Sequence, residues 1–286
     1  METNSISFTQ MELQVLCGLL ALPSPWESAG RPAASGTDDD EALARCLSQL
    51  RQRGAVHPTE SEVALPVAEL LRLTARPIID IDIRFGGPRR AGTPRRVRLR
   101  GDAQAIIETV ADESSMTFTP FANADLLLRW AQRCGLDDRP RPGGSGFTAA
   151  LAVLDACKDA AEMGDAAGAA AVLRDRGIAD DDADAFSAAL VAVEQTVAVR
   201  LSIRAGRVRE GIELFWLDAP QQRWALPSIL SPFASSAADT AAGSGDGTGG
   251  WTVDPATTML HVTPTDGDEL LAAMQAALTV ATSPSA

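Results

Sequence analysis

The sequence predicts an α+β fold that is internally duplicated, with each half made of helices, antiparallel strands and a closing helix. Short runs of alternating apolar and polar residues follow one another between groups of helical segments, which is the pattern of α+β proteins. The same order of segments also occurs twice along the chain. We therefore expect half-repeats at residues 8–135 and 147–281, related by pseudo-twofold symmetry.

Three helical segments open the first half, after a short tail at residues 1–7. The first segment begins at a capping box formed by Thr9 and Glu12. The second ends at Gly54, a residue type typical of the position after a helix. The third contains Pro66 in its first turns, which moves the true start to a later residue. We expect these helices at residues 8–20, 38–54 and 59–75.

A β-hairpin follows, and its loop is rich in arginine. Apolar and polar residues alternate over 79–84 and again over 96–100, as in strands with one apolar face. Several Gly and Pro residues between 86 and 94 separate the two runs. The first half then continues with strands at 105–111 and 116–120 and a helix from Asn123 or Asp125 through Cys134.

The second half follows a linker rich in Pro and Gly at residues 135–146. It has the same order of segments, with a low-complexity stretch at 233–250 among its strands. The carboxylates at 180–182 are expected to cap the third helix of this half. We expect helices at 148–161, 165–176 and 180–193, strands at 197–203, 210–217, 223–229, 251–253 and 259–263, and a last helix that begins at Asp266 or Asp268.

Three sequence matches between the halves support the duplication. LRQRGAV at 50–56 parallels LRDRGIA at 173–179. The strand that ends Ile83-Arg84-Phe85-Gly86 parallels one that ends Ile203-Arg204-Ala205-Gly206, and Thr119-Pro120 parallels Thr263-Pro264 before the closing helix. One such match arises easily by chance, but three in the same order do not.

Composition excludes several classes of function. The net charge of -13 argues against a general nucleic-acid binder and against an anionic membrane surface as partner. No apolar run reaches the roughly 18 residues of a spanning helix, and no basic segment precedes an apolar one at the start of the chain. We expect a cytoplasmic protein without membrane insertion, present as a monomer or weak dimer.

Enzymatic motifs are absent from the sequence, so we expect no catalytic, cofactor-binding or metal-binding residues. Neither a P-loop nor a G-x-S-x-G elbow occurs, and the chain has 2 histidines. Four scattered cysteines at helical spacing favour small buried apolar side chains over metal ligands. For Asp80 and Asp82, solvation or pairing with arginines on neighbouring strands is favoured over an acid/base pair. Trp216 and Trp224 are expected in the core.

The arginine cluster of the hairpin has two open interpretations. It can be a solvated edge hairpin whose charges discourage aggregation, or a surface for an acidic or polar protein partner. The equivalent loop of the second half has only Arg207 and Arg209. This asymmetry favours a partner role for Arg89, Arg90, Arg95 and Arg96. A regulatory or nucleic-acid-associated module that uses the same hairpin is the alternative function.

In the order of its motifs the chain resembles the EspG family of type VII (ESX) secretion-associated proteins. The resemblance spans residues 8–280. It rests on the opening helix with the LRQRG turn, on VAELLRLTARPIIDIDIRF, on the meander from RRVRLRG into the helix LLLRW, and on WTVDPATTMLHVTPTDGDELLAAM near the end.

The resemblance implies one EspG-like domain over 1–286, with a central twisted antiparallel sheet flanked by helical bundles. It implies a cytosolic chaperone or adaptor, not an enzyme, that binds a helical-hairpin substrate of the PE–PPE or a related, WXG-type kind and helps deliver it to the secretion machinery. Family members use the sheet and the loop after the strand that matches 78–85, together with C-terminal helices, to hold the tip of the substrate. Carried over by position, this implies contacts from the loop at 86–94 and from Leu271 and Met274.

Overall fold

A computed structural model describes residues 5–25, 37–87, 94–112, 114–136, 144–205, 208–220, 222–227 and 257–282. The fold is α+β with a large antiparallel sheet, as the sequence predicts. The chain divides into two compact units, one made of Met1–Ile81 and Arg96–Leu126 and the other of Asp82–Arg95 and Leu127–Ala286. Strand β2 (Ile79–Gly86) begins in the first unit and ends in the second.

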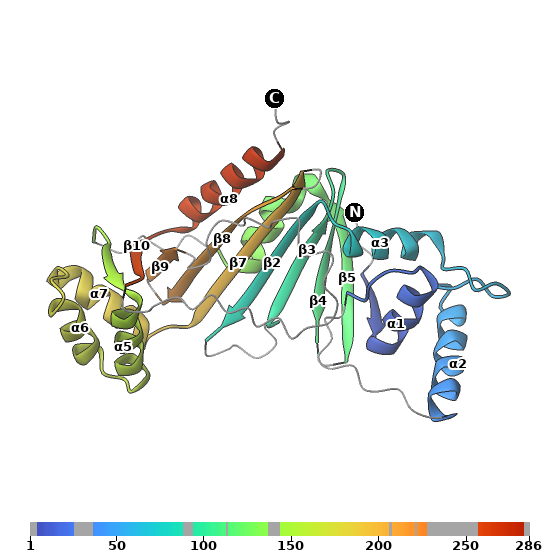
Figure 1. Ribbon diagram of the computed structural model, residues 1–286, viewed down its shortest axis with the longest axis horizontal. Helices are drawn as coiled ribbons and strands as arrows, with labels where there is room; N and C mark the ends of the chain where they lie inside the picture. The colour runs from blue at the N-terminus through green and yellow to red at the C-terminus, as the bar shows by residue number, and fades with distance from the viewer. Residues whose placement is uncertain are drawn as a thin grey trace. The chain divides into compact units, whose positions relative to one another are not determined.

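The first unit packs three helices beside an antiparallel meander (Figure 1). Its strands run in the order β1-β5-β4-β3, and the first residues of β2 follow β3. The elements are β1 (Ile6–Thr9), α1 (Gln10–Leu19), α2 (Thr37–Gln52), α3 (Leu65–Ala75), β3 (Arg96–Gly101), β4 (Ala105–Ala111), β5 (Ser115–Ala122) and the 3-10 turn η1 (Asn123–Asp125).

The core of the first unit lies between these helices and the sheet. Leu13 and Leu16 of α1, Leu50 of α2 and Leu71 of α3 form one buried cluster with Phe118 of β5. The predicted capping box begins α1, because the Thr9 hydroxyl accepts from the backbone of Glu12 and the Glu12 carboxylate accepts from the backbone of Thr9.

The second unit consists of a sheet with helices on both of its faces. The end of β2 is followed by β7, β8, β9, β10 and β6. The elements are α4 (Leu126–Cys134), β6 (Phe147–Ala150), α5 (Leu151–Glu162), α6 (Ala166–Arg174), α7 (Asp180–Val191), β7 (Gln195–Ala205), β8 (Val208–Ala219), β9 (Gln222–Pro227), β10 (Met259–Pro264) and α8 (Gly267–Thr282).

The two faces of this sheet are covered by different helices. Trp216 packs edge-to-face on Trp130 of α4, with ring centroids 6.3 Å apart, and α8 also contacts β7 and β8. Successive strand residues point to opposite faces, so the next residue, Leu217, joins the core under α5, α6 and α7. There Phe147, Phe186 and Trp224 form an aromatic cluster. Both predicted core tryptophans are confirmed.

Three sequence predictions need correction. Residues 6–9 form strand β1 instead of the end of a tail and the start of a helix, and residues 147–150 form strand β6 instead of the first turn of a helix. Both are four-residue strands, too short to show an alternating pattern. Helix α3 begins at Leu65, with Pro66 in its first turn, which confirms the later start that Pro66 indicates. The carboxylates at 180–182 lie in the first turn of α7, whose N-cap is Ala179 without a side-chain cap.

The hairpin β2–β3 is not at a sheet edge, because each of its strands has a neighbour on both sides. This contradicts the solvated-edge interpretation of the arginine cluster. The predicted strand at 251–253, the low-complexity stretch at 233–250 and both Arg89 and Arg90 lie outside the described residues.

Candidate partner-binding groove

The second unit contains a groove of about 980 Å³ on the sheet face that carries α5 and α7. Its floor is an apolar row across three strands. Ala198 of β7 lies opposite Phe215 of β8, which in turn lies opposite Leu226 of β9. Paired residues of antiparallel strands point to the same face, so all three side chains face the groove. Each is half-buried, which leaves apolar surface within reach of a partner.

Helices α5 and α7 form the wall of the groove. They contribute Leu151 and Leu154 from α5 and Leu190 and Val191 from α7. Val191 is exposed, whereas Leu154 is buried in the core beneath the wall. The groove therefore reaches the hydrophobic core of this unit at Leu154 of α5.

A charged band crosses the floor at the other end of the groove. It consists of Asp82 and Arg84 on β2, Arg200 on β7 and Glu213 on β8. Arg84 donates from Nε and Nη2 to the same oxygen of Asp82, at 3.1 Å each. Arg200 lies opposite Glu213 in the strand register, with Nε 3.5 Å from its carboxylate. The α5 wall adds three more charged residues to the lining, Asp155, Lys158 and Glu162, so charged groups lie on both the floor and the wall of the groove.

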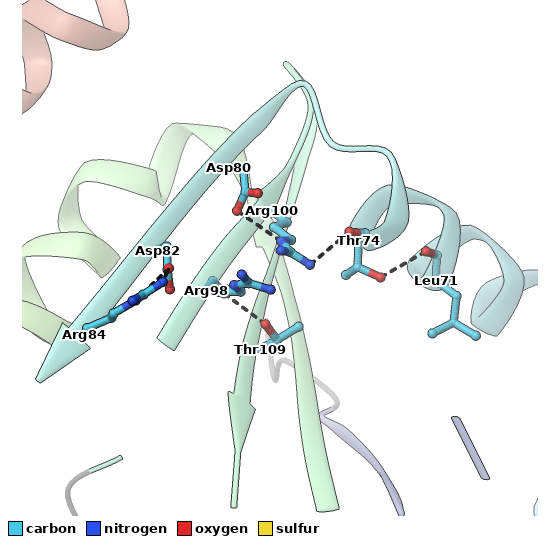
Figure 2. A network of polar contacts seen from close by, with 8 residues as sticks. All are labelled: Leu71, Thr74, Asp80, Asp82, Arg84, Arg98, Arg100 and Thr109. Carbon is cyan, nitrogen blue, oxygen red and sulfur yellow. Dashed lines mark hydrogen bonds and ion pairs between the residues drawn. The ribbon is translucent and has the colours of Figure 1, made fainter. Parts of the chain in front are cut away.

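The other predicted acidic residue, Asp80, belongs to a structural network in the first unit. It accepts from Nε of Arg100 at 3.0 Å, and Arg100 also donates to the backbone carbonyl of Thr74 in α3 (Figure 2). Asp80 and Arg100 are both largely buried. Pairing with an arginine on the neighbouring strand is therefore confirmed for Asp80, and Arg100 joins the sheet to α3.

Of the partner-binding residues predicted from the sequence, Arg95, Arg96, Leu271 and Met274 do not line the groove, and Arg89 and Arg90 lie outside the described residues. Gly87, the described loop residue after β2, does line it. Arg95 is exposed and Arg96, in β3, is half-buried; the boundary between the two units falls between them. On α8, Leu271 is half-buried and Met274 is fully buried. Sequence reasoning missed the groove because its lining is spread over five strands and two helices. A usable signal was the run Leu214-Phe215-Trp216-Leu217, which is apolar on both strand faces.

The cysteines and histidines show no arrangement for catalysis. All four cysteines are free and buried, as predicted. Burial raises the pKa of the Cys17 and Cys157 thiols from 9.0 to about 11, which suppresses the reactive thiolate. His57 and His261 are exposed, and each contacts a threonine hydroxyl. Among the described residues, no three His, Cys, Asp or Glu side chains gather as a metal site would require.

Comparison with known proteins decides the family. The model of the EspG family matches residues 9–228, which is most of the chain. The chain belongs to the EspG family. This confirms the resemblance inferred from the order of its motifs.

This EspG family member has the same fold as a chaperone of known structure. It is similar to the type VII secretion system chaperone EspG5 of Mycobacterium tuberculosis, solved in complex with a PE25–PPE41 dimer. The TM-score is 0.61 at 17% sequence identity, and the match covers 96% of each chain. No curated protein sequence matches at a significant level. Every helix in the described part of the chain is too short or too polar to cross a membrane.

Proposed function

We propose that this protein is a cytoplasmic type VII secretion chaperone, not an enzyme. It binds a helical substrate of the PE–PPE or WXG type, keeps it soluble and delivers it to the secretion machinery. The observation that carries the proposal is the half-exposed apolar row of Ala198, Phe215 and Leu226 in the groove of the second unit. The EspG5 structure, which contains a PE25–PPE41 dimer, supports the choice of partner class.

The size of the groove fits the end of a helical hairpin. A helix of 10–12 Å diameter fills roughly 500 Å³ per turn of 5.4 Å. A groove of about 980 Å³ therefore accepts about two turns. An apolar hairpin tip left in water promotes aggregation, and covering it with an apolar groove suppresses that route. The groove thus suits a chaperone that covers a tip and leaves most of its substrate outside.

The arginine loop and the α8 residues remain proposed partner contacts, but α8 contacts the sheet face opposite the groove and would make a separate contact. Arg89, Arg90, Arg95 and Arg96 distinguish the first half-repeat from the second, and the exposure of Arg95 is compatible with a contact. Leu271 can contribute through its exposed part. Met274 acts from within the core, by holding α8 on the sheet. The nucleic-acid-associated alternative is less favoured, because Arg100 of the same hairpin is paired with Asp80.

We further propose that the chain arose by internal duplication, with pseudo-twofold symmetry between half-repeats at 8–135 and 147–281 in one EspG-like domain of residues 1–286. Each half begins with a four-residue strand that leads directly into a helix, β1 into α1 and β6 into α5. Gly54 and Gly177 both follow a helix with positive φ, +70° and +79°. The strand orders β1-β5-β4-β3-β2 and β6-β10-β9-β8-β7 also correspond one to one.

The proposal is tested by co-expression with the PE–PPE pairs encoded in the same genome. The expected result is that at least one pair becomes soluble and co-elutes with this protein on size exclusion, while the protein alone elutes as a monomer or weak dimer. If every pair stays insoluble and none forms a complex, the chaperone function is wrong.

A further inference from the structure

The charged side chains that line the groove do not balance. They are the carboxylates Asp82, Asp155, Glu162 and Glu213 and the cations Arg84, Lys158 and Arg200. Four negative charges against three positive ones leave a net charge of -1 in the lining. The whole chain carries a net charge of -13, which attracts basic partners at long range. The groove therefore favours a ligand that brings a positive charge.

Asp155 is the carboxylate of the lining that has no cation. Each cation has a different carboxylate as its partner, in the pairs Arg84–Asp82, Arg200–Glu213 and Lys158–Glu162, at 3.1, 3.5 and 3.4 Å. Lys158 follows Asp155 by three residues on α5, but it pairs with Glu162, its i+4 neighbour. Asp155 is exposed, and it forms neither an ion pair nor a hydrogen bond through its side chain with the described residues. Its carboxylate is therefore open to a ligand.

Asp155 lies where the wall formed by α5 changes from apolar to charged. Leu151 and Leu154 line the groove before it, and Lys158 and Glu162 line the groove after it. Leu151 and Asp155 are one helical turn apart, about 6 Å along the helix axis. A ligand that covers the apolar wall thus also displaces water beside the carboxylate, which strengthens an ionic contact made there.

We propose that Asp155 is a specificity-determining residue that binds a lysine or arginine side chain at the tip of the substrate. This inference rests on the proposed chaperone function and adds the chemistry of the part that enters the groove. Lysine and arginine fit because their long apolar stems can lie along Leu151 while the charged end reaches the carboxylate. The apolar residues of the tip cover Phe215 and Leu226 on the floor. A tip with a carboxylate beside Asp155 is rejected by repulsion of like charges.

The test measures the dissociation constant of a PE–PPE pair that co-purifies with the wild type. Asp155→Asn removes the charge but keeps the size of the side chain, and it should weaken binding about tenfold by loss of a charged hydrogen bond. Asp155→Glu keeps the charge and should bind nearly as tightly as the wild type. The matched control is Asp159→Asn, which removes an exposed carboxylate one turn further along α5 that does not line the groove. Its affinity should equal that of the wild type. The difference between the wild type and Asp155→Asn should shrink as salt rises.

Charge exchange tests the substrate side of the same contact. Asp155→Lys should weaken binding more than Asp155→Asn does, and replacing the lysine or arginine of the substrate tip with Glu should restore it. Asp155 is exposed, so none of these variants should change the melting temperature appreciably.

An Asp155→Asn variant that binds as tightly as the wild type, or equal losses in Asp155→Asn and Asp159→Asn, would overturn the inference and leave the chaperone function intact. Tighter binding by Asp155→Lys would overturn it too, by showing that the substrate presents a carboxylate. Failure of the wild type to bind any pair would overturn the proposed function itself.

Discussion

Nε of Arg223 donates to Oδ1 of Asp218 at 2.5 Å, and these side chains are only 0% and 2% exposed. Nη2 of the same arginine donates to the backbone carbonyl of Gly135, just after α4, at 3.0 Å. The ion pair therefore holds the C-terminal end of α4 on the sheet. This is the face opposite the groove, and the contact between Trp130 and Trp216 lies on it as well.

Breaking this buried pair should destabilise the second unit strongly. Arg223→Met leaves the carboxylate of Asp218 buried without its main cation, and such changes cost roughly 3–5 kcal/mol. Urea unfolding followed by tryptophan fluorescence measures the loss, because Trp130, Trp216 and Trp224 all lie in this unit. The matched control is Lys158→Met, which removes an exposed pair with Glu162 and should cost less than about 0.5 kcal/mol. Equal losses in the two variants would contradict the role of the buried pair.

The capping box of α1 should contribute measurably to the first unit. Thr9→Ala removes the hydroxyl that accepts from the backbone of Glu12, and loss of a cap costs about 1 kcal/mol. Thr9→Ser retains the hydroxyl and should be close to the wild type. Amide hydrogen exchange of α1 reads the difference locally. The prediction fails if the amides of α1 are equally protected from exchange in Thr9→Ala and Thr9→Ser.

Alkaline pH should destabilise the protein through its buried thiols. The folded pKa of Cys17 and of Cys157 is about 11, above the ordinary 9.0, so the unfolded chain loses these protons first as the pH rises. The free energy of unfolding should therefore fall between about pH 9 and 11. Cys46 and Cys134 contribute in the same direction, because burial raises the pKa of their thiols too. The chain has no tyrosine, and Lys158 is its one lysine. Cys17→Ala combined with Cys157→Ala should therefore reduce the slope of the pH dependence without abolishing it, and an unchanged slope would contradict this assignment.

Charge reversal of the arginine loop tests whether the asymmetry between the half-repeats serves binding. Replacing Arg89, Arg90, Arg95 and Arg96 with Glu should weaken capture of a PE–PPE pair and leave the melting temperature nearly unchanged. If capture is unchanged, these arginines interact only with solvent and do not contribute to binding of the substrate.

The sequence is most informative where structure depends on local pattern. Alternation over Ile79–Arg84, the capping box at Thr9 and the glycines after α2 and α6 gave correct elements, because each depends on a few neighbouring residues. Strands β1 and β6 were missed because four residues show little alternation, and they exist only by pairing with β5 and β10.

The groove could not be predicted for a similar reason. Arg84 and Arg200 are adjacent to apolar strand residues in the sequence and look like ordinary solvated positions. What makes them a site is the arrangement of β2, β7 and β8 next to the wall of α5 and α7. The arginines that stand out in the sequence are instead concentrated in one loop, and Arg100 proved to support the sheet.

The most direct test of the central claim is the affinity of a Phe215→Glu variant for a PE–PPE pair that binds the wild type. Phe215 lies in the middle of the apolar floor, and a carboxylate there should oppose burial of an apolar tip. Leu128→Glu is the control, because Leu128 on α4 is exposed and lies outside the groove. If the groove binds the substrate, Phe215→Glu weakens binding by at least about thirtyfold, as expected for a central interface residue, and Leu128→Glu has no effect. A folded Phe215→Glu variant that binds with wild-type affinity would contradict the account.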